Sequence, residues 1–280
     1  MSEPDRARER VIATYRNSAG RYDLTNRLYY LLGVRQGAFR RRAVAALGLR
    51  PGDTVVEVGC GTGLNFPLLE EAIGPGGRII GVDVTDAMLA RARCRIRVRG
   101  WRNVTTIQAD VARFRFPAGV NAILSTYALS LVPECAEVVA RGCAALAPGG
   151  RWVVLDTGLP VGPPAWLARA LVRPFAGTDE WIARRPWETI QAAMQADLTD
   201  VRVIDLYLGC LFLAVGARAR TRSRGLTPPP APAGRRCVTH ITGPGSVPAT
   251  VLPAPAGPDT DRTRPPPWSV RCPFLRRPPS

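Results

Sequence analysis

Between residues 51 and 216, short apolar runs alternate with longer segments in which apolar residues recur every three or four positions. The short runs are rich in β-branched residues and are typical of buried strands, whereas the longer segments have the spacing of amphipathic helices. The runs predict strands over 55–58, 78–82, 104–108, 122–125 and 152–155. The segments between them predict helices over 64–73, 85–98 and from about 133 to a stop at 148–150.

This alternation indicates right-handed βαβ units and therefore a doubly wound, mostly parallel α/β sheet. Two more strands, over 201–208 and 211–215, are joined only by Gly209 and Cys210, so this closing hairpin must be antiparallel. An apolar insert over 159–197 interrupts the alternation before the hairpin. Ahead of the first strand, the pattern predicts helices over about 3–20, 22–32 and 37–47.

These patterns divide the chain into a helical lid segment over 1–50, a ligand-binding sheet domain over 51–216 and a tail over 217–280. The tail is rich in proline and arginine and has no strand or helix periodicity, so we expect it to be disordered. It holds eleven arginines and two aspartates, and so carries +9 of the formal net charge of +16. Because much of the charge lies there, it gives little support for a nucleic-acid groove, and no nucleic-acid partner is expected.

The seven cysteines are dispersed, with no CxxC pair, and the single histidine, His240, stands apart from them. This spacing predicts no metal site and is typical of reduced thiols in the cytoplasm. The first residues are charged and lack the apolar core of a signal peptide, and no apolar run is long enough to span a bilayer. We therefore expect a cytoplasmic protein.

The stretch from Val55 to Phe66, VVEVGCGTGLNF, predicts a strand, a glycine-rich turn and the start of a helix. Such a turn brings backbone N–H groups close to a ligand, because glycine has no Cβ to block the approach. A dinucleotide fold prefers the spacing G-x-G-x-x-G, whereas this turn has G-x-G-x-G, and Glu57 precedes its first glycine by two residues. A carboxylate there would repel a pyrophosphate and favours a cationic ligand such as S-adenosylmethionine (SAM).

Polar residues also mark the ends of the other predicted strands. Asp83 follows the second strand, Asp110 lies just past the third, and Ser125 ends the fourth. Ligands of parallel sheets bind outside the carboxyl ends of the strands. One crevice can therefore hold these three side chains together with the glycine turn.

Taken in order, these motifs resemble those of class I SAM-dependent methyltransferases over roughly residues 22–216. VVEVGCGTG resembles the first motif of that family, IIGVD its ribose-binding strand, QAD its adenine-binding segment and LAPGGRWVVLD its fifth-strand segment. The resemblance implies a seven-stranded sheet of order 3-2-1-4-5-7-6 with the last strand antiparallel. Tyr22 and Asp23, followed by a helix before the glycine motif, are similar to the ubiquinone/menaquinone C-methyltransferase and phospholipid N-methyltransferase group.

The resemblance implies SAM as the cofactor, with Asp83 accepting hydrogen bonds from the ribose hydroxyls and Asp110 from the adenine amine. The cofactor-binding residues that we predict are Glu57, Gly59, Cys60, Gly61, Gly63, Asp83, Val84, Met88, Asp110, Val111 and Ser125. The substrate-lining residues that we predict are Tyr22, Thr126 and Tyr127. The sequence identifies no catalytic base, since the single histidine lies in the tail.

We expect a methyltransferase for a small or lipid-like acceptor, such as a quinone or a phospholipid headgroup. The apolar part of the insert, over 166–175, is as consistent with simple packing on the sheet as with a greasy acceptor or a peripheral membrane contact. The alternatives are an RNA-directed methyltransferase, an NAD(P)-dependent oxidoreductase and a SAM-binding protein without catalysis. The sequence leaves open which acceptor atom is methylated and what the oligomeric state is.

Overall fold

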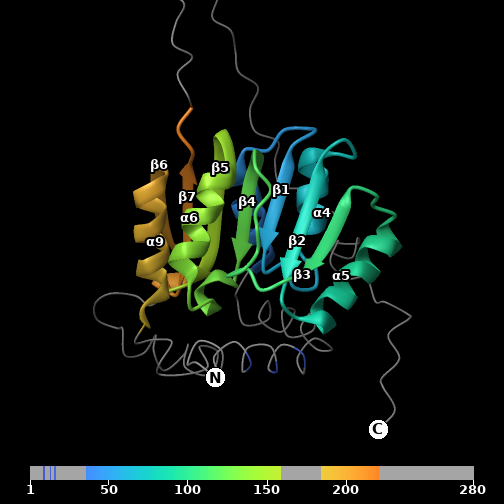
Figure 1. Cartoon of the computed structure of the whole chain (residues 1–280), viewed down its shortest axis with the longest axis horizontal. Coiled ribbons are helices and arrows are strands. Elements are labelled where there is room, and N and C mark those ends of the chain that lie inside the picture. The colour runs from blue at the N-terminus through green and yellow to red at the C-terminus, as the bar shows by residue number, and fades with distance from the viewer. Residues whose placement is uncertain (1–8, 10–12, 14–15, 17–35, 159–183, 221–280) are drawn as a thin grey trace, which may run out of the picture. The chain divides into compact units, whose positions relative to one another are not determined.

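A single sheet of seven strands, in the order β3-β2-β1-β4-β5-β7-β6, forms the centre of the fold (Figure 1). The computed structural model of the protein describes residues 9, 13, 16, 36–158 and 184–220. The strands are β1 (Thr54–Val58), β2 (Arg78–Asp83), β3 (Val104–Gln108), β4 (Val120–Thr126), β5 (Leu146–Thr157), β6 (Thr199–Leu206) and β7 (Leu211–Ala217).

Strand pairing follows the predicted topology. Strand β1 pairs in parallel with β2 on one side and with β4 on the other, and β3 and β5 extend the parallel part outward. Strand β7 runs antiparallel to both of its neighbours, β5 and β6. The predicted strand order and the reversed strand are therefore confirmed.

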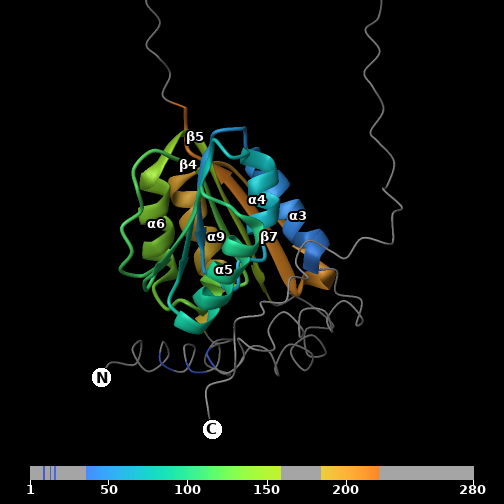
Figure 2. The ribbon, with the colours of Figure 1, turned by 90° about the vertical axis from the view of Figure 1, so that its right-hand side faces the viewer.

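Helices cover both faces of the sheet, as Figure 2 shows for α3 and α4 on one side and α6 on the other. The first face carries α3 (Gln36–Leu47), α4 (Phe66–Ile73) and α5 (Asp86–Arg99), and the second carries α6 (Cys135–Ala145) and α9 (Pro186–Asp197). Each face has its own hydrophobic core. Val55 belongs to the first core, whereas Val56 and Val58 belong to the second. Because successive side chains of a strand point to opposite faces, a strand buried on both faces needs the near-continuous valine run of β1.

The boundary between α6 and β5 differs from the prediction. The helix ends at Ala145, and the Pro148-Gly149-Gly150 segment, predicted to stop it, already lies within β5. The pairing of β4 with β5 shifts register here, so that Val120 pairs with Leu146 but Ala122 pairs with Arg151. Glycines suit this irregularity, because a Cβ at residue 150 would lie within 3 Å of backbone oxygens.

The predicted insert over 159–197 is also corrected. Its last part is α9, which starts with Pro186 in the first turn and packs against α6, so the alternation of strand and helix resumes before the hairpin. The earlier part of the insert, over 159–183, lies outside the described residues.

The remaining helices compare with the prediction as follows. The predicted helix over 64–73 begins at Phe66, because the two preceding residues belong to the glycine turn. The helix predicted over 37–47 is present as α3, whereas those over 3–20 and 22–32 and the tail after 220 lie almost wholly outside the described residues. None of the helices in the described ranges has the length and hydrophobicity that crossing a bilayer requires.

Candidate active site

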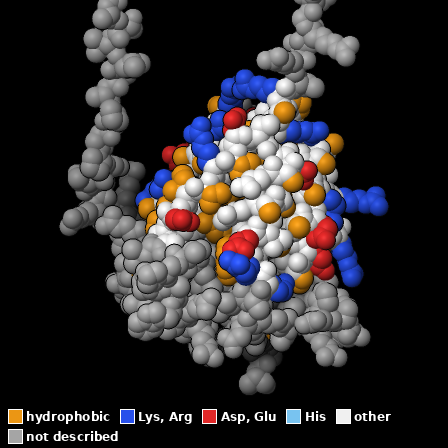
Figure 3. Space-filling model, turned by 90° about the vertical axis from the view of Figure 1, so that its left-hand side faces the viewer, with side chains coloured by type: hydrophobic (Ala, Val, Ile, Leu, Met, Phe, Trp, Pro, Cys, Tyr) orange, Lys and Arg blue, Asp and Glu red, His pale blue; other side chains and the backbone are white. Residues whose placement is uncertain are grey.

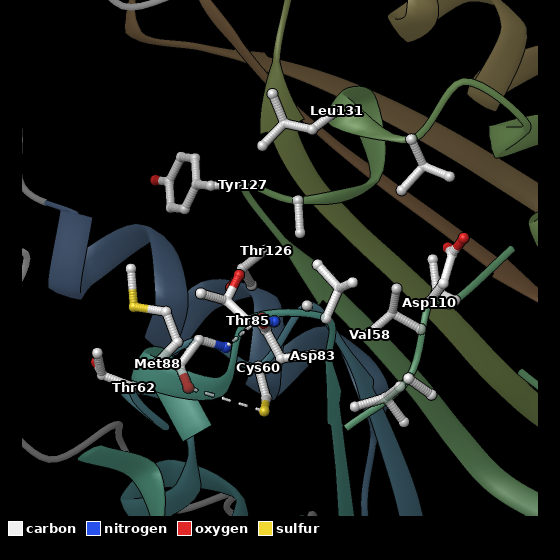
Figure 4. Close-up of a pocket in the computed structure, with 18 of the residues that line it drawn as sticks. Val58, Cys60, Thr62, Asp83, Thr85, Met88, Asp110, Thr126, Tyr127 and Leu131 are labelled. Carbon is white, nitrogen blue, oxygen red and sulfur yellow. Dashed lines mark hydrogen bonds between the residues drawn. The ribbon is translucent and has the colours of Figure 1, made fainter. Parts of the chain in front are cut away.

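A pocket opens at the carboxyl ends of β1, β2 and β4, where the predicted crevice lies (Figure 4). The predicted residues that line it are Gly59, Cys60, Gly61, Asp83, Val84, Met88, Asp110, Val111, Thr126 and Tyr127. Figure 4 shows Asp110 toward one side of the pocket and Tyr127 and Met88 toward the other, with Asp83 between them. The pocket therefore suits an elongated ligand whose parts contact different strand ends.

The glycine turn forms one wall of this pocket, and each of its three positions requires glycine for a different physical reason. All three have positive φ angles, of 64° at Gly59, 54° at Gly61 and 74° at Gly63. A Cβ at Gly59 would lie 2.2 Å from the Cβ of Ala128, whereas a Cβ at Gly61 would meet nothing within 4 Å. Gly61 thus leaves open space on the pocket side. Gly63 does not line the pocket, and its missing Cβ makes room for the Phe66 ring, 2.5 Å from where that atom would lie.

Asp83 ties the glycine turn to the start of α5. Its Oδ2 accepts a hydrogen bond from the Gly61 N–H at 2.8 Å, and its Oδ1 accepts one from the Thr85 N–H at 2.8 Å. Burial raises the pKa of this carboxyl, and the bonds from Thr85 and Gly61 oppose that rise. Since a carboxylate has about four acceptor positions, both oxygens can still accept bonds from a ligand.

Asp110 and Val111 lie past the end of β3, at the side of the pocket away from Tyr127. The Asp110 Oδ1 accepts a hydrogen bond from the Ala112 N–H at 2.9 Å, which fixes the turn. Arg141 on α6 donates to the backbone oxygens of Val111 and Ala112. This segment is thus held by its own backbone and by the second layer of helices.

Four buried polar side chains meet beside the glycine turn: Arg40, Glu57, Asn65 and Thr126. This group, called the polar cluster below, joins α3, β1, the N-cap of α4 and the end of β4. The Asn65 Nδ2 donates to the Glu57 Oε1 at 2.6 Å and to the Thr126 Oγ1 at 2.9 Å. The Arg40 Nη1 donates to the Thr126 Oγ1 at 2.6 Å and to the Asn65 Oδ1 at 3.2 Å.

Glu57 lies in this cluster and does not line the pocket. Its side chain is 1% exposed, and its Oε2 has no hydrogen-bond partner within the described part of the chain. Burial raises the pKa of Glu57 from its ordinary value of 4.5 to about 8, against the opposing effects of the Asn65 hydrogen bond and the Arg40 charge. At neutral pH the carboxyl is therefore mostly protonated, and it reaches a pocket ligand only through Asn65 and its neighbours.

Of three other predicted residues, one lines the pocket, one is buried behind it and one lies outside the described residues. Ser125 is fully buried and does not line the pocket, because its side chain points to the opposite face of β4 from that of Thr126. Tyr127 adopts a left-handed backbone conformation with φ of 56°, and its ring lies under the Arg40 guanidinium at 5.0 Å. Tyr22 lies outside the described residues.

Cysteine chemistry adds little to the site. Cys60 is buried, and burial raises its pKa well above the ordinary thiol value, which does not favour a nucleophilic thiolate. Cys60, Cys135, Cys143 and Cys210 are free, but Cys94 is disulfide-bonded, so the expectation of reduced thiols fails at Cys94. Within the described ranges, no group of histidine, cysteine or acidic residues could hold a metal ion.

Sequence reasoning missed several wall residues. The stretch from Ala128 to Pro133 contributes Leu131, Val132 and other residues to the wall, and it is held by Asp156, whose carboxylate accepts hydrogen bonds from the Ser130 N–H and Oγ. The other residues missed are Arg40, Val58, Thr62, Leu64, Val82, Thr85 and Ala109. Helical spacing could have revealed Arg40, because Arg40 shares the buried face of α3 with Ala43, Val44 and Leu47.

The face drawn in Figure 3 bears on the nucleic-acid alternative. Its arginines lie along the upper margin, where Figure 1 shows the parallel strands beginning, and also along the right-hand margin and in the lower part of the face. The pocket lies at the opposite ends of those strands. The basic side chains on this face are thus spread over it and do not form a single patch at the pocket end of the strands.

The sheet order, the reversed β7 and a pocket of this composition define a class I SAM-dependent methyltransferase domain, and this chain carries one. Residues 55–150 match a family model described as "Methyltransferase domain". This match covers β1 to the start of β5, and so includes both Asp83 and Asp110.

Among curated relatives, the ubiquinone/menaquinone biosynthesis C-methyltransferase UbiE of Ectopseudomonas mendocina is 29% identical over 157 residues. That match covers 55% of this chain and spans only 60% of the relative's own length. The demethylmenaquinone methyltransferase of Lactococcus lactis is 25% identical over 213 residues, covering 74% of this chain and 83% of the relative.

A solved structure with the same fold is the geranyl diphosphate C-methyltransferase from Streptomyces coelicolor, crystallised with S-adenosyl-L-homocysteine. It superposes with a TM-score of 0.52 at 18% identity, covering 66% of this chain and 79% of its own. At this identity the likeness concerns the fold.

Proposed function

We propose that the protein transfers the methyl group of SAM to a small or lipid-like acceptor, with a quinone or a phospholipid headgroup as the leading classes. The observation that carries this proposal is the position of Asp83. Its carboxylate is fixed by two backbone N–H groups, between an open glycine turn and the start of α5. This arrangement fits a nucleoside whose ribose hydroxyls donate to both carboxylate oxygens.

The rest of the cofactor contacts follow from the order of residues along the pocket. Asp110 and the Val111 N–H lie where the adenine edge would be, and the apolar side chain of Val84 lines the same pocket and suits a ring face. Met88 lines the pocket on the side away from Asp110. Gly61 leaves space for the methionine part, and its N–H is already used by Asp83, whereas the missing Cβ of Gly59 makes room for Ala128. In this arrangement Glu57 supports the turn through Asn65 without touching the ligand.

The acceptor would lie toward Thr126 and Tyr127. The adjoining wall is formed by Leu131, Val132 and Pro133, and such an apolar surface favours a greasy acceptor over a charged polymer. SAM supplies an already activated methyl group. What the chain must do is hold the acceptor in line with that group and exclude water, which accounts for most of the acceleration in such reactions.

The curated quinone methyltransferases that resemble this chain support the quinone class. An RNA acceptor and an NAD(P) ligand are the alternatives. Because +9 of the formal net charge of +16 lies in residues 217–280, the arginine content gives the RNA alternative little support. The G-x-G-x-G spacing disfavours the NAD(P) alternative.

Two measurements test the proposal. Calorimetric titration should give a micromolar Kd for SAM, roughly −8 kcal/mol, and much weaker binding of NAD. The protein is then incubated with methyl-labelled SAM and, separately, extracted lipids, a quinone precursor mixture and total RNA, with Asp83→Ala as the blank. Label in the lipid or quinone fraction supports the proposal. Tighter binding of NAD than of SAM, or label in RNA alone, would contradict it.

A further inference from the structure

Arg40 is the one basic side chain that lines the described pocket, and it is 7% exposed. Its guanidinium is held from two sides. The Nη1 donates to Thr126 and Asn65, and the plane lies over the Tyr127 ring at 5.0 Å. These contacts fix the direction of the guanidinium without neutralising its charge, since none of the three partners is a carboxylate.

The charge of Arg40 is not balanced within the described part of the chain. No described carboxylate lies within ion-pair distance of it, and the neighbouring acid, Glu57, reaches it only through Asn65. Glu57 is moreover mostly protonated at neutral pH, because burial raises its pKa to about 8. Buried charges in proteins are normally paired, since an isolated one is costly to remove from water. An anion at this place would complete the pair.

The remaining guanidinium nitrogens, Nε and Nη2, make no hydrogen bond to any described residue. Two adjacent N–H donors in a fixed plane match the two oxygens of a carboxylate. Thr126 and Tyr127, which hold the guanidinium, lie at the side of the pocket away from Asp110 (Figure 4). With adenine at Asp110 and ribose at Asp83, the amino-acid end of the cofactor would lie at this side.

We propose that Arg40 binds the α-carboxylate of the methionine part of SAM and so selects cofactors that carry this group. This assignment rests on the proposed function, because it takes the adenosine end to lie at Asp83 and Asp110. The other source of an anion is an acidic acceptor, and the test below separates the two.

The test compares two ligands and three proteins. The ligands are SAM and decarboxylated SAM, which keeps the adenosine, sulfonium and amine but lacks the carboxylate. The proteins are the parent, Arg40→Gln and Arg41→Gln. Arg41 is the matched control, because it is the next residue on α3, has the same charge and is exposed. Calorimetry gives the affinities, and melting curves report folding.

The parent should bind SAM about 10- to 100-fold more tightly than decarboxylated SAM, the range for a lost charge-assisted hydrogen-bond pair. In Arg40→Gln this preference should shrink to less than about 3-fold, mainly through weaker SAM binding, whereas Arg41→Gln should keep it. If Arg40→Gln does not fold, Arg40→Lys replaces it, and the preference should fall several-fold because an ammonium lacks the planar fork.

Each other outcome is informative. If Arg40→Gln weakens both ligands equally, Arg40 only positions Thr126 and Asn65, and the assignment is wrong. If the parent binds both ligands equally, or if Arg40→Gln binds SAM like the parent, the anion that pairs with Arg40 is not the SAM carboxylate. The assignment is then also wrong, while the proposed function stands. If the parent binds neither ligand, the proposed function itself fails and the role of Arg40 fails with it.

Discussion

Replacing Asp83 is the most informative perturbation of the site, because this carboxylate has two separable roles. It accepts hydrogen bonds from the Gly61 and Thr85 backbone N–H groups, each at 2.8 Å, and it is placed to accept the ribose hydroxyls of the cofactor. The first role concerns the stability of the turn, and the second concerns affinity.

Both effects can be bounded from the structure. A hydrogen bond to a charged group contributes about 1.5–3 kcal/mol, so losing the ribose contacts in Asp83→Ala should weaken SAM binding by about one to three orders of magnitude. The same change leaves the Gly61 and Thr85 donors without their acceptor. Gly61 is only partly buried, so water replaces some of the loss there, whereas Thr85 is buried and its N–H would be left without an acceptor. We expect about 1–3 kcal/mol of destabilisation.

Asp83→Asn should be milder in both respects. Its amide oxygen can keep one of the two backbone bonds, but its NH2 group would face the other backbone donor. We therefore expect SAM affinity and melting temperature between those of the parent and of Asp83→Ala. The assay is a SAM titration of each variant beside its melting curve.

Asp53 provides the matched control. Its carboxylate also accepts a backbone hydrogen bond, from the Arg50 N–H at 2.8 Å, but it lies in the turn before β1, at the other end of the strand from the glycine turn. Asp53→Ala should lower the melting temperature without changing the Kd for SAM. If Asp83→Ala binds SAM like the parent, or if Asp53→Ala weakens binding as much, the ribose is not at Asp83 and the proposed orientation of the cofactor is wrong.

Three further predictions follow from other contacts. Because the raised pKa of Glu57, about 8, keeps it protonated when folded, its contribution to stability should be complete below pH 4.5 and be lost as pH rises from 4.5 through 8. Glu57→Gln, which cannot ionise, should gain up to roughly 5 kcal/mol over the parent across that window, measured by denaturation. Gly59→Ala should unfold the turn, since its Cβ would lie 2.2 Å from that of Ala128, whereas Gly61→Ala should cost only about 1 kcal/mol while still weakening SAM binding. A chain ending at Gly216 should melt below one ending at Arg220, because it lacks the last residue of β7 and the arginine that donates to the end of α6 and the start of β5.

Each of these has a result that would contradict it. An unchanged stability difference between Glu57→Gln and the parent from pH 5 to 8 would mean that the buried carboxyl is already ionised. Equal melting of the two glycine variants would show that the contact at residue 59 relaxes freely. Equal melting of the two truncated chains would place the end of the folded domain at Gly216, where the sequence pattern put it.

Much of the fold could be predicted from local patterns alone. The valine and isoleucine runs marked six of the seven strands within about two residues at each end, and the exception, β5, begins six residues before the predicted run. The alternation of strands and helices then indicated a mostly parallel sheet of right-handed βαβ units. The strand order itself was implied by the resemblance to class I SAM-dependent methyltransferases. Asp83 and Asp110 could likewise be placed at the pocket, because a residue that follows a parallel strand must lie at the carboxyl edge of the sheet.

What the tertiary structure decided is which neighbours each side chain meets. The sequence placed Glu57 with the cofactor because it precedes the glycine motif. The strand pleat turns its side chain toward α3 and α4, where the Asn65 side chain donates a hydrogen bond to it. Gly63 belongs to the same motif, yet its space is taken by the Phe66 ring.

Arg40 is a pocket residue that the sequence could not single out. It stands in a run of three arginines, 40 to 42, and local composition gives no reason to choose among them. The packing of α3 against β4 and β5 buries the first and leaves the next two exposed. Sequence periodicity sets which elements form and in what order, because it acts between residues close in the chain. The polar cluster and the wall beside Tyr127 join residues up to 86 positions apart, and only packing of the whole sheet brings them together.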